Sequence, residues 1–128
     1  MRKPVILDVN PDAEGLAWEA EFLGRLEAHV LTCQGPEARG GCPLLDGRSC
    51  AKVDAADGIL FQLDLDKEPH RAILAQYAST VDAPIRVIVR PGQAEEYADL
   101  LARVEVRETY PGPAALDGFE AEVESELE

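Results

Sequence analysis

Three cysteines lie in one stretch of the chain, and their thiols can do three kinds of chemistry. Cys33, Cys42 and Cys50 are separated by eight and seven residues. They can stay reduced and pack as small apolar side chains, or Cys42 and Cys50 can form a disulfide that acts as a redox switch. They can also bind zinc or an iron–sulfur cluster, although this spacing differs from that of structural zinc sites. A fourth ligand would then come from one of three side chains: His29, His70 or Asp46.

A second group of candidate residues consists of carboxylates and amides that follow short apolar runs. Asp8 and Asn10 follow one run, and Gln62, Asp64 and Asp66 follow another. Alternate residues of a strand face the same way, so the last three share a face if their strand continues. Carboxylates that meet at the carboxyl ends of neighbouring strands can bind Mg²⁺ through oxygen. The alternative is that Asp64 and Asp66 are solvated residues at a strand end.

These residues must be positioned by strands and helices, which alternate along the chain. Amphipathic periodicity predicts a first helix directly after Asp12, whose side chain is placed to cap it. The other predicted helices cover 69–79, 93–102 and a C-terminal stretch with Leu116, Phe119, Val123 and Leu127 on its buried face. Apolar runs predict five strands, at 4–7, 29–33, 58–63, 85–89 and 104–106. With right-handed crossovers, this order predicts a three-layer α/β/α domain with an open parallel sheet in the order 2-1-3-4-5.

One segment, from about residue 34 to residue 56, interrupts the alternation. Glycine and proline are too dense in its first half for a helix of normal length. We therefore predict a single domain over residues 1–128 in which an irregular, cysteine-bearing loop replaces the second helix. A loop of this length inside a compact domain is uncommon and is often functional.

The composition is that of an acidic globular domain, and it excludes several classes of partner. The chain has 128 residues, is 46% hydrophobic and carries a formal net charge of −13, which suits one domain with one core. Nucleic acids and anionic membrane surfaces attract cationic proteins, so we expect neither as a partner. The apolar runs are too short to span a bilayer or to form a signal peptide. Together with the odd number of cysteines, this predicts a cytoplasmic protein.

The order and spacing of the predicted elements resemble the receiver domain of response regulators along nearly the whole chain. The segment 6–11, Ile-Leu-Asp-Val-Asn-Pro, is similar to the first strand and acidic turn of that family. The segment 84–89 is similar to its fourth strand, and Pro111 to a proline that follows its fifth. The resemblance implies a flavodoxin-like, CheY-like fold.

The same resemblance implies a set of site residues, most of which differ in this chain. A working receiver has two adjacent acids for Mg²⁺, and the corresponding positions here are Asp8 and Val9. Gln62 stands at the position of the phospho-accepting aspartate, Val89 at that of a Ser or Thr, and Tyr110 at that of a Lys. Four of the five roles are therefore vacant. This pattern predicts a pseudo-receiver that is not phosphorylated.

These observations lead to three hypotheses about function. The first is a non-catalytic regulatory or protein-interaction domain that binds another protein, or itself, through the face formed by 93–102, 104–106 and the acidic final helix. The second is a small metal- or redox-binding protein that uses the three cysteines. The third is a degenerate phospho-acceptor that uses Asp8 with Asp64. The chain has no P-loop, G-x-G-x-x-G or G-x-S-x-G motif, so we do not expect an enzyme. We expect no cofactor under the first hypothesis, whereas the others require Mg²⁺ or a cysteine-bound metal.

Overall fold

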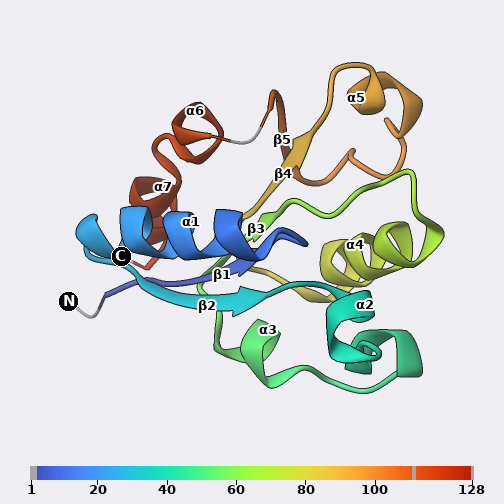
Figure 1. Cartoon of the computed structure of the whole chain (residues 1–128), viewed down its shortest axis with the longest axis horizontal. Helices are drawn as coiled ribbons and strands as arrows, with labels where there is room; N and C mark the ends of the chain where they lie inside the picture. Colours follow the sequence, from blue (N-terminus) through green and yellow to red (C-terminus); the bar gives the residue numbers. More distant parts are fainter. Residues whose placement is uncertain (1–2, 111, 128) are drawn as a thin grey trace.

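Five parallel strands form one sheet in the order β2-β1-β3-β4-β5, which confirms the predicted topology (Figure 1). This computed structural model describes residues 3–110 and 112–127, so Pro111 lies outside the described residues. The strands are β1 Val5–Val9, β2 His29–Cys33, β3 Gly58–Phe61, β4 Ile85–Val89 and β5 Glu105–Glu108.

Helices cover both faces of the sheet and make the three predicted layers. On one face, α1, α6 and α7 pack through Leu23, Leu116, Phe119 and Val123 against Ile6 and Leu60. On the other face, α4 packs through Ile73, Leu74 and Tyr77 against Leu7, Ile59 and Phe61. The bounds are α1 Ala13–Arg25, α2 Pro36–Arg39, η1 Pro43–Asp46, α3 Ala51–Ala55, α4 Glu68–Thr80, α5 Gln93–Glu96, α6 Pro113–Leu116 and α7 Phe119–Glu126.

The alternation of side chains along β1 decides where its acidic residue points. Ile6 packs on the α1 side of the sheet, whereas Leu7 and Val9 pack on the α4 side. Because the side-chain period of a strand is two, Asp8 lies on the same face as Ile6. The carboxyl of Asp8 is therefore buried beneath α1. That helix begins as predicted, with the side chain of Asp12 accepting a hydrogen bond from the amide of Glu14 at 3.2 Å.

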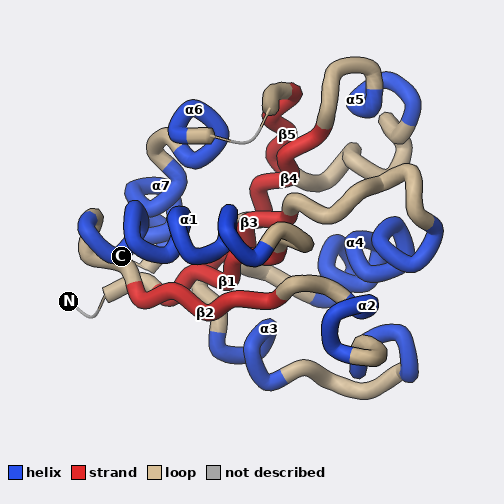
Figure 2. Tube along the Cα trace, in the orientation of Figure 1, coloured by secondary structure: helices blue, strands red, loops and turns tan. Residues whose placement is uncertain are grey.

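The segment 34–56 differs from the predicted irregular loop. It contains three short helical stretches, α2, η1 and α3, which Figure 2 shows as short blue segments joined by tan loops. Glycines with positive φ bound the first two stretches: Gly35 at 99°, Gly40 at 72° and Gly47 at 76°. Glycine adopts this backbone region at no steric cost, so Gly40 ends α2 and Gly47 ends η1 after four residues each. The five-residue α3 ends before Ala56, whose backbone is extended.

The C-terminal half also departs from prediction at several element ends. β3 ends at Phe61, two residues early, and α5 ends at Glu96 instead of residue 102. The predicted final helix is divided into α6 and α7 by a turn at Gly118, whose φ is 74°. Turn geometry at one glycine overrides the helical periodicity of the apolar residues on either side. No helix within 3–110 and 112–127 is long and apolar enough to cross a membrane.

Candidate functional site

A buried cluster of two carboxyls and two amides lies beneath α1 at the carboxyl end of β1. Asp8 is fully buried and Glu19, on α1, is 2% exposed. The Nε2 of Gln62 donates to Oδ1 of Asp8 at 3.0 Å and lies 3.0 Å from both carboxyl oxygens of Glu19. The Nδ2 of Asn10 donates to Oε1 of Glu19 at 3.0 Å. The two amides therefore hold two acids together in the interior.

The electrostatics of this cluster favour a bound proton. Burial, followed by the hydrogen bond and the negative charge of Glu19, raises the pKa of Asp8 to about 9. Asp8 is therefore protonated at neutral pH, because two neighbouring carboxylates in a dry site do not both ionise. Its Oδ2 is buried and has no donor among the described residues. The bound proton lets Asp8 donate a hydrogen bond to Glu19.

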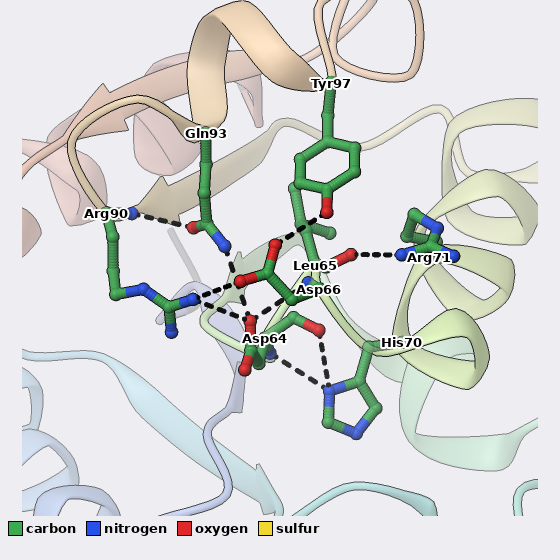
Figure 3. A network of polar contacts seen from close by, with 8 residues as sticks. All are labelled: Asp64, Leu65, Asp66, His70, Arg71, Arg90, Gln93 and Tyr97. Atoms are coloured by element: carbon green, nitrogen blue, oxygen red, sulfur yellow. Dashed lines mark hydrogen bonds and ion pairs between the residues drawn. The ribbon is translucent and has the colours of Figure 1, made fainter.

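A second polar network lies at the carboxyl ends of β3 and β4 (Figure 3). Arg90 reaches Oδ1 of Asp64 at 3.2 Å and Oδ2 of Asp66 at 2.6 Å. Asp64 also accepts from the amide of Asp66 at 3.0 Å and from Nε2 of Gln93 at 3.4 Å. Burial acts to raise the pKa of Asp64, but these bonds and the charge of Arg90 outweigh it and hold that pKa below its usual value. Tyr97 completes the network by donating to Oδ1 of Asp66 at 2.6 Å.

His70 connects this network to the segment that follows β2. Its Nδ1 accepts from the amide of Asp64 at 3.0 Å, and its Nε2 lies 2.6 Å from Oε1 of Glu37 on α2. With a proton on Nε2, the imidazole donates to Glu37 while Nδ1 accepts from the amide of Asp64. Lys67 approaches the same carboxylate at 3.7 Å. The short helix α2 is therefore fastened to the start of α4 through one buried histidine.

A crevice of about 390 Å³ opens between the two networks, and several of the predicted site residues line it: Asn10, Gln62, Asp64, Val89 and Tyr110. Each of these residues follows or ends a strand, as expected for open α/β sheets. Val89 is nevertheless buried in the core cluster, and the side chain of Tyr110 is 69% exposed at the rim.

The predicted magnesium site requires Asp8, Asp64 and Asp66 together, and the structure places them in different networks. Asp8 pairs with Glu19, while Asp64 and Asp66 share Arg90. Among the residues described, no three His, Cys, Asp or Glu side chains are grouped so as to hold a metal ion. Val9 packs in the core where a second metal-binding acid would stand. The donors at this edge therefore do not fit Mg²⁺. As in the alternative, Asp64 and Asp66 are partly solvated, with side chains 29% and 48% exposed, and both are ion-paired with Arg90.

The cysteines are distributed between two parts of the α4 side of the sheet. Cys33 and Cys42 are half-buried, pack against the core cluster and line one small cavity with Tyr77. Cys50 is buried and lines a different groove, between α3 and the end of α4. The structure contains no disulfide between Cys42 and Cys50, whose thiols are free. This packing agrees with cysteines that act as small apolar side chains and gives no support to a shared metal centre.

Sequence reasoning missed Glu19, although a signal for it was present. Leu16, Glu19 and Leu23 follow one another at helical spacing, and all three are buried. An acid on the apolar stripe of a helix requires a polar partner inside the protein. Here those partners are Gln62 and Asn10, which come from two different loops.

Arg86 is a second missed residue, and its side chain lies on the α6 and α7 side of the sheet. This guanidinium stands in the middle of β4 and is fully buried. It donates to the carbonyls of Ala115 at 3.2 Å and Asp117 at 2.7 Å, pairs with Glu122, and lies over the ring of Phe119. Arg86 therefore ties α6 and α7 to the sheet. An arginine inside an otherwise apolar strand was the signal in the sequence.

Comparison with known proteins identifies the fold. No protein-family model matches the chain, and no curated protein matches its sequence. The receiver domain of a DNA-binding response regulator from Colwellia psychrerythraea superposes with a TM-score of 0.65 at 15% identity, covering 98% of both chains. A response-regulator receiver domain from Francisella gives 0.70 at 8% identity, covering 98% of this chain and 100% of that one. A pilus assembly-related protein from Burkholderia pseudomallei gives 0.66 at 19% identity, covering 95% and 90%.

This chain has the receiver fold. The likeness covers nearly its whole length, and it confirms the flavodoxin-like architecture that the sequence predicts. At these identities the likeness concerns the fold, and chemistry must be argued from the residues at the site.

Proposed function

We propose that this chain is a regulatory domain of the receiver type that acts by binding another protein and is not phosphorylated. The receiver fold supports a regulatory role. The observation that carries the rest is the place of Gln62. It stands where the resemblance to receivers puts the phospho-accepting aspartate, and its N–H groups are used to bridge Asp8 and Glu19. A carboxamide does not accept a phosphoryl group as a carboxylate does.

The nearest alternative acceptor, Asp64, is already occupied by other contacts. Its carboxylate binds Arg90, Gln93 and the amide of Asp66. All three contacts meet Oδ1 of Asp64, stabilise the ionised form and hold the carboxylate against Arg90 and Gln93. In the proposal, the ion pairs of Arg90 hold the crevice in one arrangement, and no cofactor is required.

The assay for this half of the proposal is incubation with Mg²⁺ and a small phosphodonor, followed by intact-mass measurement. We expect no mass increase of one phosphoryl group in the wild-type chain. A working receiver domain treated in parallel shows that the donor is active. An increase that disappears in Asp64→Asn would overturn the proposal and identify Asp64 as the acceptor.

The proposed partner is another protein, and the face expected to bind it comprises α5, β5 and α7. A second copy of the chain is a poorer partner, because two domains of charge −13 repel each other. We expect charge reversal at Glu124 on α7 to weaken binding at this face. The same reversal at Glu14, an exposed residue of α1, is the matched control.

A further inference from the structure

A surface groove of about 550 Å³ runs between α4 and the chain that follows α5. Three alanines form its floor: Ala72 and Ala75 belong to α4, and Ala98 belongs to the chain that follows α5. All three are exposed. Because Ala72 and Ala75 lie three residues apart on one helix, they leave a shallow path along its surface. A helix from another chain can approach such a path closely and place a ridge of side chains in it.

The end of the groove is closed by a contact between its two walls. The guanidinium of Arg71, on α4, lies 5.6 Å from the ring centroid of Tyr97 and donates to the carbonyl of Leu65 at 2.7 Å. Tyr97 in turn donates to Asp66, and Figure 3 shows these side chains turned toward one another from separate elements. The contact between Arg71 and Tyr97 thus fixes the two walls of the groove relative to each other without a ligand.

The rim of the groove is acidic. Glu68 stands on the α4 wall, and Glu95, Glu96 and Asp99 stand on the other wall, all of them exposed. Among the lining residues, all of which are described, Arg71 is the sole cation, and its charge is engaged by Leu65 and Tyr97. An apolar floor between four carboxylates favours an occupant that is apolar on one side and positively charged at its edges.

We infer that this groove binds a cationic amphipathic helix of another protein, with apolar side chains on the alanine floor and Lys or Arg beside the acidic rim. The inference rests on the proposed function in that the partner is a protein. The groove shares α5 with the face of α5, β5 and α7, but its other wall is α4 and it includes no residue of β5 or α7. Helices dock in grooves through anchors at i, i+3, i+4 and i+7, which the spacing of Ala72 and Ala75 can receive. Acidic segments, including a second copy of this chain, meet like charge at the rim.

The test uses a fluorescently labelled synthetic peptide of about 15 residues, long enough for a helix to form on binding. Leucines occupy one helical face and lysines the remainder. We expect binding to the wild-type domain, measured by fluorescence anisotropy, that weakens as salt is added. Ala75→Lys places a long cation on the groove floor and is expected to weaken binding at least about tenfold. Ala17→Lys makes the same change at an exposed position of α1, away from the groove and from the face of α5, β5 and α7, and is expected to change binding by less than about twofold.

Several outcomes overturn the inference. Equal losses in Ala75→Lys and Ala17→Lys would show that only total charge matters. The inference is also overturned if the peptide does not bind the wild-type domain. It is overturned as well if a peptide with the same composition but scattered leucines binds equally well. If circular dichroism shows Ala75→Lys to be unfolded, the pair Glu95→Gln and Asp99→Asn replaces it, and unchanged affinity there contradicts the inference. None of these outcomes bears on phosphoryl transfer, because the phosphodonor assay reports on Gln62 and Asp64 and not on the groove.

Discussion

The amide of Gln62 stands between two buried acids, with its Nε2 3.0 Å from Oδ1 of Asp8 and 3.0 Å from Oε1 of Glu19. The three residues come from β1, α1 and the end of β3, which are neighbours only in the folded chain. An amide supplies two N–H donors there without adding charge. A carboxylate at the same position would add a negative charge beside two other carboxyl groups.

We therefore expect Gln62→Glu to destabilise the fold. A third carboxyl in this interior either ionises against its neighbours or takes up a proton, and both outcomes cost free energy. The free energy of unfolding should fall by about 2–4 kcal/mol at pH 7. Urea denaturation measures the change. Gln76→Glu makes the same substitution at an exposed position of α4 and should change stability by less than about 0.5 kcal/mol. Similar losses in both variants would show that Gln62 does not bridge the two acids.

The acid pair also predicts how stability depends on pH. The pKa of Asp8 is raised to about 9 in the folded chain, whereas an unfolded aspartate has a pKa near 4. The folded state thus holds a proton that the unfolded state releases between these values, so stability falls as pH rises through this window. The slope from this one group is at most about 1.4 kcal/mol per pH unit. Urea denaturation at a series of pH values from 5 to about 9 measures it.

Asp8→Asn is the informative variant for this pH dependence. An asparagine resembles the protonated aspartic acid in shape and can donate to Glu19, but it cannot lose a proton in this range. We expect the variant to fold at pH 7 and to show a flatter decline in stability toward pH 9. A profile as steep as that of the wild type would assign the decline to other groups.

The sequence predicted the sheet well because its three inner strands, β1, β3 and β4, are mostly apolar and almost wholly buried, and such runs are recognised without long-range information. Three of the five residues expected at the crevice line it, since Asn10, Gln62 and Asp64 each follow such a run. Which of the acidic side chains contact one another was not predicted. Whether Asp8 meets Asp64 or Glu19 depends on how α1 packs over β1, and Glu19 lies eleven residues further along the chain.

The ends of the elements were predicted less well, for a related reason. Residues 93–102 have helical periodicity, yet the helix ends at Glu96. The next residue, Tyr97, donates a hydrogen bond to Asp66, which lies in the loop between β3 and α4. Local propensity is weak compared with such tertiary contacts. In the 34–56 segment, the density of glycine and proline correctly limited helix length, but it did not show that three short helical stretches form there.

Arg86 provides a third prediction, concerning α6 and α7. Its planar fork donates to two carbonyls, of Ala115 and Asp117, while it pairs with Glu122. Lysine keeps the charge but cannot reproduce this fork. We expect Arg86→Lys to lower the free energy of unfolding by about 2–4 kcal/mol and to speed amide hydrogen exchange in α7. Arg25→Lys, at an exposed pair with Glu21 on α1, should cost less than about 1 kcal/mol. Unchanged exchange in α7 would contradict the role assigned to Arg86.

The last prediction concerns the close approach of α7 to β3. A Cβ added at Gly58 would lie 2.3 Å from Cγ2 of Val123 and 3.2 Å from Cζ of Phe119. Both neighbours are fully buried and have no space into which to move, so Gly58→Ala should cost about 1–3 kcal/mol through overpacking. Gly24→Ala is the matched control, because nothing lies within 4 Å of a Cβ at that position of α1. It should stabilise the helix by about 0.5–1 kcal/mol.

A double-mutant cycle distinguishes overpacking at Gly58 from a general intolerance of alanine in β3. Val123→Ala removes the methyl group that the new Cβ would meet, at the cost of a cavity when made alone. If the two side chains collide as the structure indicates, the double variant is more stable than the sum of the single effects by about 1 kcal/mol or more. Additive losses would mean that α7 does not pack on β3 at Gly58, and the tie through Arg86 would then be the principal contact holding the C-terminal helices to the sheet.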